Sequence, residues 1–88
     1  MGNSRRRTVI REDDLEIDLI RLFGSVQDGD LFLEGAEALL SRDPLIGEPA
    51  EKNSLIWILP MAPIDDRSVS LYYTFDSQTV ILLGLSSF

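Results

Sequence analysis

The sequence predicts an α+β domain in which a hairpin of two helices packs on one face of an antiparallel sheet. Apolar residues recur at helical spacing in the first half of the chain and alternate with a two-residue period in the second half. With 88 residues, the chain has room for one domain, residues 1–88, with a lean core. The expected order is strand, helix, helix, strand, strand, strand.

The first third of the chain predicts a short strand followed by a helix. Residues 6–11 have a β-branched centre, which favours a strand. The acidic residues 12–14 gather where a helix N-terminus favours negative charge, and Gly24 is a natural end for the helix. Between them, apolar residues follow at helical spacing: Leu15, Leu19, Leu22 and Phe23.

A second helix is predicted to begin near Asp28 or Asp30, because either aspartate can serve as its N-cap. The helix is expected to end before Pro44, and residues 44–53 then predict a loop because they hold two prolines and a glycine. The apolar face of this helix is formed by Phe32, Ala36, Leu39 and Leu40.

Residues 55–59 predict a strand that is apolar on both faces. The run is rich in strand-forming residues, and Pro60 is expected to close it. Trp57 alternates with Ile56 and Ile58, so each face of the strand carries large apolar side chains. A helix pair covers only one face of a sheet. We therefore expect a second copy of the chain or a segment of a partner protein to cover part of the other face.

Residues 69–75 and 79–85 predict two further strands joined by a tight turn. Alternation places Tyr73 on the buried face and Tyr72 on the opposite face, and Gly84 marks a candidate bulge. Tyr72 joins two residues of the preceding strand in a predicted partner-binding sheet face: Ile56, Ile58 and Tyr72.

The composition excludes much of enzyme chemistry. The chain has no cysteine and no histidine, which removes disulfides, thiol nucleophiles and the commonest acid–base group. We expect no catalytic residue, cofactor or metal site: Asp65 and Asp66 offer oxygen ligands for a cation, but a solvated turn is the preferred interpretation. Because the sequence has neither a long apolar run nor a signal-peptide pattern, we expect a cytoplasmic protein without a membrane partner.

The net charge of −7 is unevenly distributed. Four arginines lie within the first eleven residues, which leaves 4 basic against 15 acidic residues, or −11, in the rest of the chain. An acidic body repels phosphate, so nucleic acid is disfavoured as a partner and a basic protein fits better. The arginines are a candidate nucleic-acid or partner contact, although we favour a charged edge strand that prevents edge-to-edge pairing: Arg5, Arg6, Arg7 and Arg11. On an alternating strand, Arg5, Arg7 and Arg11 would share one face.

Several segments of the sequence resemble the RelE/ParE superfamily of bacterial toxins. They are Arg-Asp-Pro-Leu-Ile-Gly-Glu-Pro at 42–49, Ile-Trp-Ile-Leu at 56–59, Leu-Tyr-Tyr-Thr-Phe-Asp at 71–76 and Thr-Val-Ile-Leu-Leu-Gly-Leu at 79–85. The resemblance covers about residues 6–86. It implies that a second helix ends before a Pro and Gly loop, and that a Tyr-x-x-Asp strand is followed by an aliphatic strand.

The two branches of the superfamily imply different activities. In the ribonuclease branch, lysines and arginines on the sheet cut ribosome-bound messenger RNA, because cations must stabilise charge beside the scissile phosphate. Here the position expected for an arginine falls near Val69 and Ser70, and Lys52 and Arg67 are the only basic residues from Asp43 onward. The ParE branch poisons DNA gyrase by binding it and lacks those catalytic residues.

The leading hypothesis is therefore a toxin-like component of a type II toxin–antitoxin system that acts by protein binding. Its expected partner is a small antitoxin protein or a second copy of the chain. A non-toxic binding or assembly module on the same fold, as a homodimer or a subunit, is the second hypothesis, and a ribosome-dependent messenger-RNA endonuclease is the third. The sequence thus favours binding over catalysis and leaves catalysis open.

Overall fold

The computed structural model describes residues 6–87, in which two helices and the strands of one sheet follow each other closely. Four elements precede the long strands: β1 (Thr8–Arg11), α1 (Asp13–Phe23), α2 (Val26–Arg42) and the 3-10 turn η1 (Pro44–Ile46). They are followed by β2 (Glu48–Pro49), β3 (Trp57–Ile64), β4 (Arg67–Phe75) and β5 (Thr79–Ser87).

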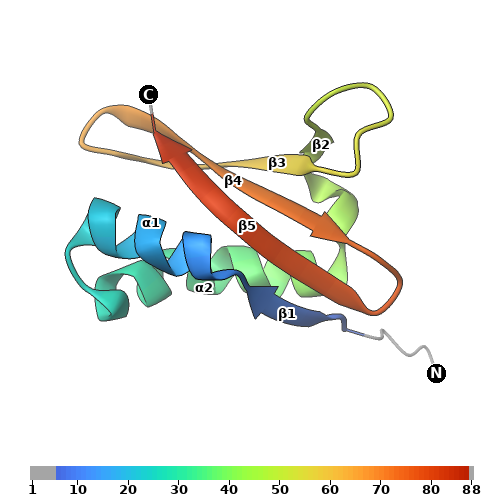
Figure 1. Ribbon diagram of the computed structural model, residues 1–88, viewed down its shortest axis with the longest axis horizontal. Helices are drawn as coiled ribbons and strands as arrows, with labels where there is room; N and C mark the ends of the chain where they lie inside the picture. Colours follow the sequence, from blue (N-terminus) through green and yellow to red (C-terminus); the bar gives the residue numbers. More distant parts are fainter. Residues whose placement is uncertain (1–5, 88) are drawn as a thin grey trace.

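Within these residues the sheet is five-stranded, with the order β1-β5-β4-β3-β2. The α+β class is confirmed, and β2 to β5 are antiparallel as expected. The sheet is mixed rather than wholly antiparallel because β1 pairs in parallel with β5, Val9 lying beside Val80. A parallel pair needs a long crossover, and here the rest of the fold supplies it (Figure 1).

Both helices lie on one face of the sheet, as the sequence predicted (Figure 1). Gly24 ends α1 in the left-handed conformation, with φ +78°. The prediction for the start of α2 was wrong: its N-cap is Ser25, whose hydroxyl accepts a hydrogen bond from the Asp28 N–H at 3.2 Å. Because Ser25 directly follows Gly24, the second helix begins as soon as the first one ends, and Asp28 lies in its first turn. None of the helices in the described part of the chain is long and apolar enough to span a bilayer.

The core forms between the helices and the inner face of β4 and β5. Tyr73 is fully buried, as the alternation in β4 predicted, and Trp57 lies beside it with ring centroids 6.5 Å apart. Phe75 completes this aromatic group on the inner face, 5.3 Å from the Trp57 ring. The buried apolar residues are Leu15, Leu19, Leu33, Ala36, Leu40, Val69, Leu71, Tyr73, Val80, Leu82 and Leu85.

The structure corrects the expected ends of β3. The strand does not end at Pro60 but continues to Ile64. Beyond Ile58, β3 has β4 as its only strand neighbour among the described residues, so it forms a sheet edge where a missing proline N–H is tolerated. Asp65 and Asp66 then form the hairpin turn, with φ angles of 49° and 65°.

The expected loop at residues 44–53 contains the turn η1 and the short strand β2, which the sequence did not predict. Tyr73 holds this segment: its hydroxyl donates to the Pro44 carbonyl at 2.6 Å and accepts from the Gly47 N–H at 3.2 Å. Burial raises the pKa of the Tyr73 phenol. A Cβ atom at Gly47 would overlap the Tyr73 hydroxyl and the Ile58 carbonyl oxygen, so only glycine fits between them.

Two glycine substitutions should therefore have opposite effects on stability. Gly47→Ala should lower the free energy of unfolding by about 2–3 kcal/mol, because the methyl group has no space. Gly35→Ala should raise it by about 0.5–1 kcal/mol, because Gly35 lies inside α2 with open space around it. Urea unfolding of the two variants measures both changes. A urea midpoint of Gly47→Ala equal to that of the wild type would contradict the close approach at Gly47.

Candidate partner-binding surface

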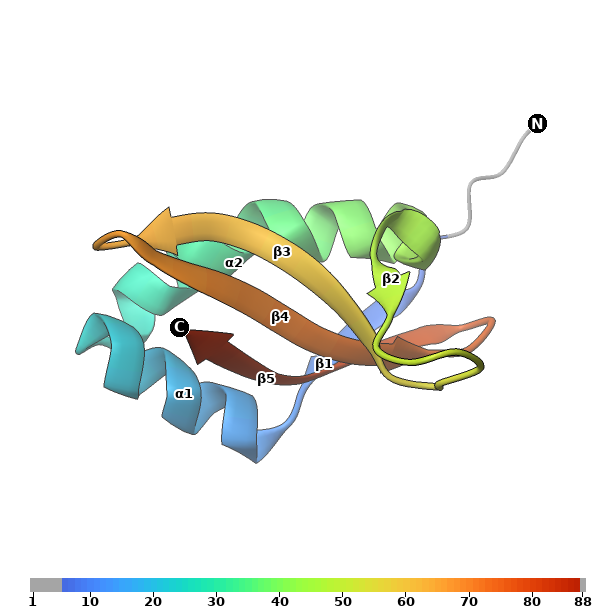
Figure 2. The same cartoon turned by 90° about the horizontal axis from the view of Figure 1, so that it is seen from above.

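The outer face of the sheet carries no helix within residues 6–87, and Figure 2 looks onto this face from above. Trp57 and Leu59 pack against the core, so alternation places Ile58 on the outer face. Ile58 pairs with Tyr72 of β4, and Ile56, just before β3, is 42% exposed. The predicted residues Ile56, Ile58 and Tyr72 thus lie together on the outer side of the sheet.

A β-bulge shapes this outer face. Tyr72 pairs with Gly84 and Tyr73 pairs with Leu82, so Leu83 is an extra residue in β5. Leu82 and Leu85 are three positions apart, yet both are buried, because the extra residue restores the inward position of Leu85. The bulge that Gly84 suggested is confirmed by this register shift.

The bulge borders an apolar hollow of about 220 Å³, which we call the bulge hollow. Its lining is neutral and nearly all apolar. Pockets that bury a drug-sized ligand usually exceed about 300 Å³, so a space of this size suits one or two side chains of a protein partner. The lining residues are Ile56, Tyr72, Leu83, Gly84, Leu85 and Ser86.

Asp18 of α1 stabilises the bulge from the helix side. Its carboxylate accepts a hydrogen bond from the Leu85 N–H at 3.0 Å, which satisfies this backbone group beyond Leu82, the last residue of β5 that pairs with β1. A Cβ atom at Gly84 would lie only 3.1 Å from the same carboxylate. A local sequence pattern does not reveal this role, because Asp18 and Leu85 are 67 positions apart in the chain.

The two sides of the bulge hollow are also fixed by hydrogen bonds. The Ser86 hydroxyl donates to the Tyr72 hydroxyl at 3.2 Å. The Ile56 N–H donates to the Ser54 hydroxyl at 3.0 Å, and the Ile56 carbonyl accepts from the Ala50 N–H at 2.8 Å. Hydrogen bonds therefore tie residues on both sides of the bulge hollow to neighbouring groups of the protein.

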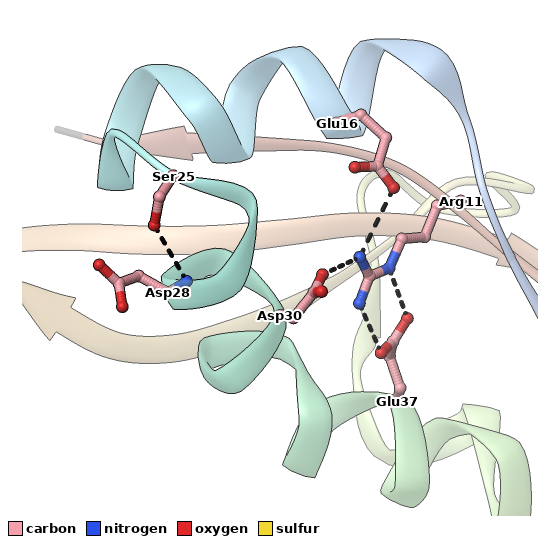
Figure 3. A network of polar contacts seen from close by, with 6 residues as sticks. All are labelled: Arg11, Glu16, Ser25, Asp28, Asp30 and Glu37. Atoms are coloured by element: carbon pink, nitrogen blue, oxygen red, sulfur yellow. Dashed lines mark hydrogen bonds and ion pairs between the residues drawn. The ribbon is translucent and has the colours of Figure 1, made fainter.

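The structure places Arg11 in an internal network of ion pairs (Figure 3). Its Nε–H and Nη2–H donate to both carboxylate oxygens of Glu37, each at 2.9 Å, and its Nη1–H donates to Asp30. Glu16 of α1 lies 3.5 Å away. Hydrogen bonding to Glu37 raises the pKa of Arg11 further above its ordinary value. This arginine joins β1 to both helices, and its guanidinium is only partly exposed.

Arg7 also has internal partners. Its Nε–H donates to the Asp76 carbonyl at 2.7 Å, and its guanidinium carbon lies 5.9 Å from the centre of the Phe75 ring. Arg6 is exposed, and Arg5 lies outside the described residues. The sequence predicted that Arg5, Arg7 and Arg11 share one face. The guanidinium groups of Arg7 and Arg11 contact other groups of the protein, so these two residues do not form a free cationic surface.

Removing the cation of Arg11 should destabilise the fold. Arg11→Met leaves the carboxylates of Asp30 and Glu37 close together without a counter-charge, so the free energy of unfolding should fall by about 1–3 kcal/mol. The matched control is Arg6→Met, which should change it by less than about 0.5 kcal/mol. Urea unfolding measures both. A wild-type midpoint for Arg11→Met would show that the network contributes nothing.

Removing the carboxylate of Asp18 should loosen the bulge. Asp18→Ala leaves the Leu85 N–H without its acceptor, at a cost of about 1–3 kcal/mol. Hydrogen exchange followed by NMR should show faster exchange at Leu85 in this variant and an unchanged rate in Asp14→Ala, from the same helix. If Leu85 stays protected in Asp18→Ala, the assigned role of Asp18 is wrong.

Comparison with known proteins supports the fold. No protein-family model and no curated protein matches the sequence. Among solved structures, the chain is similar to a chain of the toxin–antitoxin complex RelBE2 from Mycobacterium tuberculosis, with a TM-score of 0.75 and 22% identity. The match covers 100% of this chain and 98% of that chain. The expected resemblance is confirmed at the level of the fold: the chain shares the fold of a chain of that complex.

Proposed function

We propose that the chain is the toxin-like component of a type II toxin–antitoxin pair and that it acts in the cytoplasm by binding protein. The observation that carries the proposal is the likeness to a chain of a toxin–antitoxin complex, which extends over nearly the whole length of both chains. A fold that is shared over nearly the whole length of both chains supports a similar mode of assembly by analogy of fold.

The outer face of the sheet supports protein binding. The bulge hollow is neutral, apolar and held in shape by Asp18, Ser54 and Ser86. Burial of an apolar anchor in a preformed hollow contributes strongly to protein association, because little freedom is lost on binding. A small antitoxin segment is the partner that this proposal requires.

The charged residues support binding more than RNA cleavage. Cleavage needs cations that are free to contact a scissile phosphate and the charge that develops on it. Arg7 and Arg11 contact the protein itself, while Lys52 lies in the β2–β3 loop and Arg67 begins β4. A ribosome-dependent endonuclease therefore ranks third among the three hypotheses.

A non-toxic binding or assembly module is the second candidate function. The neutral lining of the bulge hollow favours it, since an uncharged apolar surface suits association with another protein or a second copy. The acidic body favours a basic protein partner. Growth measurements separate this candidate from a toxin, because only a toxin needs a cellular target.

The test is tightly controlled expression in a bacterial host. Induction of the intact chain should arrest growth, and co-expression of the small protein encoded beside it in its native genome should restore growth. Tyr72→Asp, which places a charge on the outer face of the sheet, should weaken the rescue by the neighbouring protein more than Glu34→Ala on the surface of α2.

The unfolding midpoint of each variant must be measured alongside growth, so that loss of the fold is not mistaken for loss of binding. Unhindered growth with abundant folded protein would contradict a toxin and favour the binding module. Growth arrest that is accompanied by cleavage of messenger RNA would contradict action by protein binding alone.

A further inference from the structure

We infer that the segment that covers the bulge hollow is a basic amphipathic peptide, with an apolar side chain in the hollow and lysines or arginines beside the start of α1. The inference takes one element from the proposed function, namely that the chain binds a protein partner. It adds the chemistry of that partner, which follows from the surroundings of the hollow.

Leu83 connects the bulge hollow to an acidic surface. The same side chain lines a second hollow of about 270 Å³, whose other lining residues are Glu12, Asp13 and Asp14. A partner side chain that contacts Leu83 therefore comes close to carboxylates at the N-terminal end of α1. Since these carboxylates are exposed, a cation can reach them without first being buried.

The acidic side chains beside Leu83 are available for a partner. Within residues 6–87, ion pairs form at Glu16, Asp18, Asp30 and Glu37 but not at Glu12, Asp13 or Asp14. The positive end of α1 supports their negative charge, and lysines or arginines of a partner would neutralise it. An apolar anchor and a cationic flank are thus both matched by features of this surface.

The overall charge favours the same occupant. Residues 12–88 carry a net charge of −11, so an acidic segment would approach against a repulsive field, whereas a basic segment would be attracted to it. A second copy would bring another body with the same excess of carboxylates to this face. A basic amphipathic segment of a different protein avoids both penalties.

The test is selection of peptides from a random phage-displayed library on the folded full chain, at physiological salt. Counter-selection on Leu83→Asn removes peptides that bind elsewhere. The enriched peptides should carry net positive charge together with large apolar residues. Their affinity should fall about tenfold when Glu12→Gln, Asp13→Asn and Asp14→Asn are combined, since each exposed pair contributes a fraction of this change.

Two matched controls locate the binding surface. Leu39→Asn changes an exposed leucine on α2 and should leave the affinity unchanged. Asp28→Asn combined with Glu34→Gln removes two carboxylate charges beside a separate hollow of about 610 Å³ on α2 and should also leave the affinity unchanged. Circular dichroism confirms that each variant is folded, and the charge variants keep the test valid if Leu83→Asn does not fold.

Other outcomes would overturn the inference. The selection could enrich neutral or acidic peptides, or enrich no peptide. The affinity of the enriched peptides could also fall with Asp28→Asn and Glu34→Gln instead of with the variants at the start of α1. A dimer in sedimentation experiments that Leu83→Asn abolishes would place a second copy on this face and would also overturn it. Growth arrest together with acidic peptides would reject this inference but not the proposed function, and basic peptides without growth arrest would do the reverse.

Discussion

The rest of the structure depends on the packing of both helices against the inner face of β4 and β5. Because a strand alternates between two faces, burying Val69, Leu71 and Tyr73 under the helices commits their neighbours in β4 to the outer face. A small domain has only enough chain to cover one face of its sheet in this way. Among residues 6–87, no helix covers the outer face.

The bulge in β5 changes this simple alternation beside the bulge hollow. A regular strand would place Leu82 and Leu85 on opposite faces, whereas the extra residue lets both stay in the core. The arrangement needs a hydrogen-bond acceptor from outside the sheet, and Asp18 provides it. A helix residue thus shapes a surface on the far side of the sheet.

The contacts of the charged residues differ from those that their positions in the sequence suggest. Arg11 is one of the few cations of the described chain, yet it neutralises carboxylates of α1 and α2 rather than facing a partner (Figure 3). Arg11 pairs with Glu16, Asp30 and Glu37, and among residues 6–87 no ion pair forms at Glu12, Asp13 or Asp14. Because the charge of Arg11 is paired inside the protein, the surface at Glu12, Asp13 and Asp14 keeps its negative charge.

The sequence by itself determined the α+β class, the order of the main elements, the end of α1 at Gly24 and the inward position of Tyr73, because period and turn chemistry are local properties. It also placed Ile56, Ile58 and Tyr72 on one outer face. Only the tertiary structure decided that β1 pairs in parallel with β5, that Arg11 binds Glu37 and that Asp18 holds the bulge. These contacts join residues far apart in the chain, and a local pattern specifies which face a residue occupies but not which distant residue lies beside it.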